Sequence, residues 1–210
     1  MVESAILLQI LGGKCPADSH RLSNDDCLKR GLGYAPPKAT ALREFLERFH
    51  EPELKKLRPA RAEQKSFIFP ASKHLEALQQ VQAGGVQRIA KLYAQQGQAQ
   101  RIATVDQDAT LIESHKRSAL WYYEGGRGCQ PMAAVWAELA LADQFRDGNV
   151  PAKQEPLTCA KLAFAALPAT ITRRYFRGNS ACREQDLLDW LMRRHGRRSP
   201  AGALGLRSAR

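Results

Sequence analysis

The pattern of hydrophobic and polar positions changes its period near residue 100. Before that point apolar residues recur three and four positions apart, as in Leu42, Phe45, Leu46 and Phe49. This spacing places them on one helical face. A longer segment of the same kind covers residues 72–96, and Gly84-Gly85 within it predicts a break or a kink. We therefore expect a mainly helical N-terminal region over residues 1–100.

From residue 101 the period becomes two. Asp106 and Asp108 then share one strand face with Ile102 and Thr104, while Ala103 and Val105 fall on the other. Further strands are predicted over 119–123, 130–136, 139–145 and 170–177, and helices over 157–167 and 184–194. Strands followed by helix, strand and helix are typical of an α/β arrangement, which makes the whole chain α+β.

The charge is strongly positive and unevenly distributed. The chain has 32 Lys and Arg residues against 21 Asp and Glu, a net charge of +11. Six arginines and no acid lie in residues 193–210, which we expect to form a basic, disordered tail. A basic protein favours polyanionic partners such as nucleic acid. The alternative is a mildly basic body with a solvated, charged end.

The cysteines and apolar segments bear on the compartment. Five scattered cysteines without a Cys-x-x-Cys pair indicate free thiols in a reducing compartment. No apolar run approaches the length of a membrane span, and Glu3 stands where a signal peptide would be basic. We expect a cytoplasmic protein that does not enter a membrane. Cys15, His20 and Cys27 could hold zinc only with a fourth ligand that the spacing does not provide.

The most suggestive local chemistry is the pair Asp106 and Asp108 at the end of an apolar strand. Carboxylates two residues apart on a strand lie roughly 6–7 Å from each other on the same face. Like charges held together favour a divalent cation between them. The simpler alternative is a strand that runs into a polar turn with both acids solvated.

Four blocks of the sequence, taken in order, are similar to those of a known family. The first is Thr104-Val-Asp-Gln-Asp-Ala-Thr110 and its continuation to Arg117, and the second is Tyr123-Glu-Gly-Gly-Arg-Gly-Cys-Gln-Pro131. The third is Ala142-Asp-Gln-Phe-Arg-Asp-Gly-Asn-Val-Pro151, and the fourth is Tyr175-Phe-Arg-Gly-Asn-Ser-Ala-Cys182. Together they resemble a DDE-type insertion-sequence transposase of the insertion sequence thirteen-eighty group, and the resemblance extends from about Leu8 to Trp190.

The resemblance implies a helical region, 1–100, that helps to bind transposon ends. It also implies an incomplete RNase H-like domain, 101–192, with a mixed sheet and flanking helices. In such enzymes three acids hold Mg²⁺ ions that promote phosphodiester cleavage and strand transfer. Asp108, which begins Asp-Ala-Thr, or Asp106 would be the first acid and a metal ligand. Asn179 stands where the family's second aspartate is expected, and the third acid, a glutamate, is not found.

These expectations lead to three functional hypotheses. The first is a C-terminally truncated transposase that acts on double-stranded DNA at transposon ends and is catalytically impaired. The second is a non-catalytic DNA-binding fragment that binds those ends, associates with itself or inhibits an intact transposase. The third is an unrelated α/β hydrolase or metal protein that uses Asp106 and Asp108.

Overall fold

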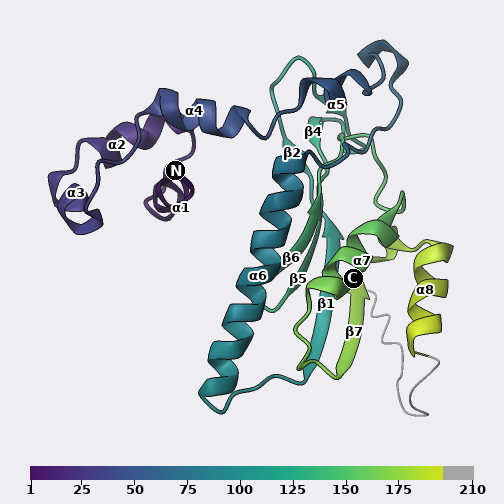
Figure 1. The fold of residues 1–210 in the computed structure, drawn as a ribbon. Coiled ribbons are helices and arrows are strands. Elements are labelled where there is room, and N and C mark those ends of the chain that lie inside the picture. The colour runs from purple at the N-terminus through teal and green to yellow at the C-terminus, as the bar shows by residue number, and fades with distance from the viewer. Residues whose placement is uncertain (196–210) are drawn as a thin grey trace. The chain divides into compact units, whose positions relative to one another are not determined.

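The computed structural model describes residues 1–195, and the chain divides into two compact units, with the boundary in the sequence between Pro52 and Glu53 (Figure 1). Most of the basic tail predicted for 193–210 therefore lies outside the described residues. The long helix α6, which the sequence analysis grouped with the N-terminal region, belongs to the second unit. Helices and mixed sheets occur together, so the α+β class predicted from the sequence is confirmed.

The first unit is built from short helices around three buried leucines, Leu8, Leu22 and Leu42. Asp25 starts one of these helices by accepting a hydrogen bond from the Leu28 amide at 2.9 Å. Gly33 ends it at φ +73°, a conformation that favours glycine. The elements are α1 (Val2–Ile10), η1 (Pro16–Ser19), α2 (His20–Ser23), α3 (Asp26–Leu32) and α4 (Ala39–Glu47).

The second unit begins with α5 (Pro52–Lys56), η2 (Arg61–Glu63) and the long helix α6 (Lys73–Gln95). The break predicted at Gly84-Gly85 is wrong, because α6 is one continuous helix. Each glycine costs about 1 kcal/mol of helix propensity. Burial of the next residue, Val86, in the main core offsets that cost. The helix is also capped at its start by Ser72, whose hydroxyl accepts a hydrogen bond from the Leu75 amide.

A four-stranded mixed sheet forms the centre of this unit. Its order is β6-β5-β1-β7, with β7 parallel to β1 and the other neighbours antiparallel. A second, three-stranded sheet has the order β2-β4-β3 and follows β1 directly in the chain. The strands are β1 (Ile102–Ala109), β2 (Ile112–Glu113), β3 (Leu120–Trp121), β4 (Arg127–Cys129), β5 (Met132–Trp136), β6 (Leu139–Gln144) and β7 (Arg173–Gly178).

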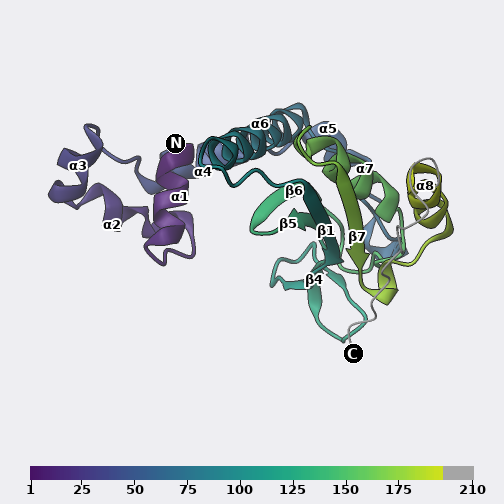
Figure 2. The same ribbon diagram turned by 90° about the horizontal axis from the view of Figure 1, so that it is seen from below.

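The two faces of the main sheet differ in their surroundings. Ala103 and Val105 of β1 are fully buried in a core that also holds residues of α6 and α7 (Pro156–Ala166), and both helices lie on one side of the sheet (Figure 2). The ring of Phe164 on α7 meets that of Trp190 on α8 (Gln185–His195) edge to face, with centroids 5.2 Å apart. The opposite face bears the exposed alternate residues of β1 and β7, and the predicted site lies there.

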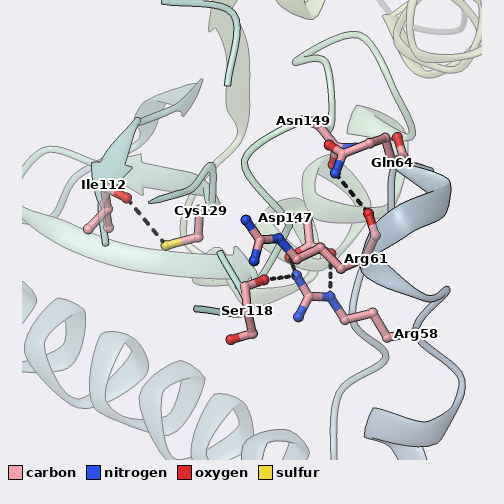
Figure 3. A network of polar contacts seen from close by, with 8 residues as sticks. All are labelled: Arg58, Arg61, Gln64, Ile112, Ser118, Cys129, Asp147 and Asn149. Atoms are coloured by element: carbon pink, nitrogen blue, oxygen red, sulfur yellow. Dashed lines mark hydrogen bonds and ion pairs between the residues drawn. The ribbon is translucent and has the colours of Figure 1, made fainter. Parts of the chain in front are cut away.

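A buried ion pair joins the start of this unit to its loops (Figure 3). Arg58 donates two hydrogen bonds to the Asp147 carboxylate, each 2.8 Å long, and a third to the Ser118 carbonyl at 2.6 Å. The Asp147 side chain is only 6% exposed, and burial raises its pKa although Arg58 acts to lower it. Asn149 adds a link to the same segment by donating to the Gln64 carbonyl at 2.8 Å.

We expect Arg58→Ala to lower the free energy of unfolding by about 3–5 kcal/mol, because it leaves the Asp147 carboxylate buried without its cation. The loss should shrink as the pH falls, since a protonated carboxyl costs less to bury than a charged one. Urea unfolding at several pH values measures both effects. The control is Lys56→Ala, which breaks the exposed Lys56–Glu53 pair and should cost less than about 1 kcal/mol. Equal losses for the two variants would contradict the role given to Arg58.

Candidate functional site

Strand pairing brings the three predicted site residues together. β1 lies between β5 and β7, and its parallel pairing with β7 sets Asp106 opposite Arg177. Asn179 directly follows β7, at the same end of the sheet as Asp108. Asp106 and Asp108 lie on the face of β1 opposite to the buried Ala103 and Val105, as the period of two predicted. The site is therefore the carboxyl end of two adjacent parallel strands.

Asn179 is held by one contact on each side of its amide. Its Nδ2 donates to Asp108 Oδ1 at 2.7 Å, and its Oδ1 accepts from the Cys182 backbone N–H at 3.1 Å. The second contact caps the short helix η3 (Ser180–Cys182). Because only the NH₂ group can donate and only the oxygen can accept, the two contacts together orient the amide. The same Asp108 oxygen also accepts from the Ala109 amide at 2.8 Å.

Asp106 is paired with a cation. The Arg177 guanidinium donates two hydrogen bonds to its carboxylate, from Nε to Oδ1 and from Nη2 to Oδ2, the latter 2.6 Å long. This hydrogen bonding and the charge of Asp106 raise the pKa of Arg177. The sequence analysis missed Arg177, because its place beside Asp106 depends on a pairing between residues 71 positions apart.

These contacts do not fit the metal site that the resemblance implies. Hydrogen-bond donors already engage the carboxylates of both Asp106 and Asp108. Glu184, the first acid after Asn179, instead caps α8 by accepting from the Asp186 and Leu187 amides. Within residues 1–195 no group of three or more His, Cys, Asp or Glu side chains is arranged to hold a metal ion. The zinc alternative at Cys15, His20 and Cys27 has no such group either.

The covered side of the sheet has buried polar groups that the sequence analysis also missed. Gln107 of β1 donates to the Pro156 carbonyl at 2.9 Å, while its Oε1 has no partner among the described residues. Arg146, just after β6, is fully buried, and burial lowers its pKa. None of its side-chain nitrogens has a hydrogen-bond partner in the described part of the chain. Arg146 looks like any basic surface residue in the sequence, so only the packing identifies it.

Comparisons with protein-family models, with curated proteins and with solved structures found no match to this chain. The transposase resemblance thus depends on the sequence blocks given above and remains a hypothesis. In the described part of the chain, no helix has the length and apolar character needed to cross a membrane.

We expect Asn179→Asp to lower the free energy of unfolding by about 1–2 kcal/mol at low salt. The substitution replaces a hydrogen bond to Asp108 with two carboxylates at the same short separation. Millimolar Mg²⁺ should recover the loss, because a divalent cation can bind between two carboxylates. Thermal unfolding with and without Mg²⁺ measures this.

The matched control is Asn179→Ala, which also removes the hydrogen bond to Asp108 but adds no charge. It should be destabilised without any response to Mg²⁺, and it additionally loses the cap of η3. If Asn179→Asp were as stable as the original chain without Mg²⁺, the contact between Asn179 and Asp108 would not be formed in solution.

Proposed function

We propose that the chain is a DNA-binding protein built on the catalytic-core fold of a DDE-type transposase. The observation that carries this proposal is the order of the main sheet, β6-β5-β1-β7, with β7 parallel to β1. The resemblance predicts the first acid on the first, central strand and the second acid after the fourth. Asp106 and Asp108 lie on β1, which is the first strand of this sheet and has a neighbour on each side. Asn179 follows β7, which is the fourth strand of the same sheet in chain order.

The exposed sheet face supports contact with a phosphate backbone. Arg173 and Arg177 lie on β7 four residues apart, so both point to this face, and both are exposed. Tyr175 lies between them on the same face. Arginines spaced about 13 Å apart along a strand can contact separate phosphates of one DNA strand. The net charge of +11 adds a long-range attraction to DNA.

The two partners of the acids favour a non-catalytic role. Two-metal phosphodiester cleavage needs carboxylates that together hold both ions. Here the residue beside Asp108 is Asn179, whose neutral amide brings no negative charge toward a cation, and Asp106 is paired with the Arg177 guanidinium. The proposed activity is therefore binding to double-stranded DNA at transposon ends, alone or together with an intact transposase, without strand cleavage by this chain.

We expect salt-sensitive binding of the full chain to blunt duplex DNA, with Arg173→Gln weakening it several-fold, because each phosphate contact releases counterions. Arg88→Gln is the control, since Arg88 is an exposed arginine on α6, at the other face of the sheet. A third variant replaces Arg197, Arg198, Arg207 and Arg210 with glutamine to measure the contribution of the tail. Fluorescence anisotropy across a salt series gives the affinities.

The outcomes distinguish the sources of binding. If the full chain fails to bind at low salt, DNA binding is excluded. If only the tail variant loses affinity, the sheet face is not the binding surface and recognition by the family's fold is unsupported.

We further expect no strand cleavage of plasmid DNA with Mg²⁺ or Mn²⁺, because the described residues hold no group of three His, Cys, Asp or Glu side chains arranged to hold a metal ion. Asn179→Asp should not restore cleavage, because it returns one carboxylate beside Asp108 but leaves Glu184 engaged as the cap of α8. Asp108→Ala serves as the control for contaminating nuclease. Cleavage by the unmodified chain that disappears in Asp108→Ala would refute the non-catalytic role.

A further inference from the structure

The small sheet carries exposed aromatic side chains next to a cation. Trp121 on β3 pairs directly opposite Arg127 on β4, so the two side chains share one face. The Arg127 guanidinium lies 4.7 Å from the centroid of the Trp121 ring, while Trp121 stays 49% exposed. Tyr123, in the turn between these strands, is 79% exposed. We call Trp121, Tyr123 and Arg127 the aromatic platform.

The platform lies beside the candidate site. β2 begins three residues after β1 ends and pairs with β4, so the small sheet continues from the end of β1 that bears Asp108. The turn that holds Tyr123 is closed by a hydrogen bond from the Tyr122 amide to the Gly126 carbonyl, 2.9 Å long, and Gly125 in it has φ +90°. A hydrogen bond to Glu124, the charge of Glu124 and desolvation raise the pKa of Tyr123, and the charge of Asp108 adds to the shift.

The surroundings of the platform favour an anionic, aromatic ligand. The two tryptophans of the sheets differ in exposure: Trp136 is buried in the main core, whereas Trp121 is exposed. Lys116 and Arg117, in the loop between β2 and β3, are exposed, and with Arg127 they outnumber the two acids of the small sheet, Glu113 and Glu124. Exposed rings with neighbouring cations are the combination that single-stranded nucleic acid uses, with bases on the rings and phosphates on the cations.

We propose that the aromatic platform stacks unpaired nucleobases of DNA, at a single-stranded segment or a frayed end that lies next to Asp108. The proposal deepens the DNA-binding function above and depends on it. Trp121 supplies the larger stacking surface, with Arg127 against its ring, and the exposed ring of Tyr123 stacks a second base. The arginines of β7, in this proposal, contact the phosphates of the double-stranded part of the DNA.

The experiment compares the full chain with Trp121→Ala, Tyr123→Ala and Trp121→Phe on three probes: a mixed-sequence single-stranded oligonucleotide, a blunt duplex, and that duplex with an unpaired overhang. The matched control is Tyr93→Ala, an exposed aromatic of the same unit that lies on α6. We expect each alanine variant at the platform to lose about ten-fold in affinity for the two probes with unpaired bases. Affinity for the blunt duplex should change less than about two-fold, and Trp121→Phe should keep most of the binding.

Tryptophan fluorescence tests the contact in the unmodified chain, where stacking of a base quenches the exposed Trp121. Unpaired probes should quench the emission of the chain and of Tyr93→Ala, but not that of Trp121→Phe. Equal losses on blunt and unpaired probes, or quenching unchanged in Trp121→Phe, would overturn the platform. If the original chain binds the blunt duplex and its platform variants behave like it on every probe, only this inference fails. If the original chain binds no DNA, the proposed function fails as well.

Discussion

The parallel pairing of β1 with β7 is the interaction on which the site depends. It joins residues 71 positions apart and sets Val105 opposite Phe176 and Asp106 opposite Arg177. The same register places Asn179 beside Asp108, and the Asn179 oxygen then caps η3, which leads into α8. A shift of one residue would send Arg177 to the covered face of the sheet and remove both partners from the acids.

Two arginine–aspartate pairs in this unit have different consequences because their exposure differs. Asp147 is almost fully buried, so its pairing with Arg58 decides whether the neighbouring loops can pack. Asp106 is 32% exposed and Arg177 is 61% exposed, so water screens their attraction and the pair adds little stability. The geometry is similar in both pairs, but burial makes only the Arg58–Asp147 pair important for stability.

In the proposed binding of DNA, the main sheet and the small sheet make two different kinds of contact. The arginines of β7 offer charge along an exposed strand, whereas Trp121 and Tyr123 offer ring surface at the end of β1. Phosphate contacts depend on salt and not on base pairing, while stacking requires bases that have left the duplex. The junction between paired and unpaired DNA would therefore lie close to Asp108.

Local periodicity in the sequence determined much of this protein. The period of two placed Asp106 and Asp108 on one face, and the strands and helices predicted after residue 101 occur close to their expected positions. Tertiary structure alone decided the rest, because those features depend on contacts between distant segments. Burial of Val86 keeps α6 continuous through Gly84-Gly85, and packing buries Arg146. The register of two strands gives Asp106 its cation, which no local pattern of charge could predict, since a strand's period specifies its faces but not its neighbours.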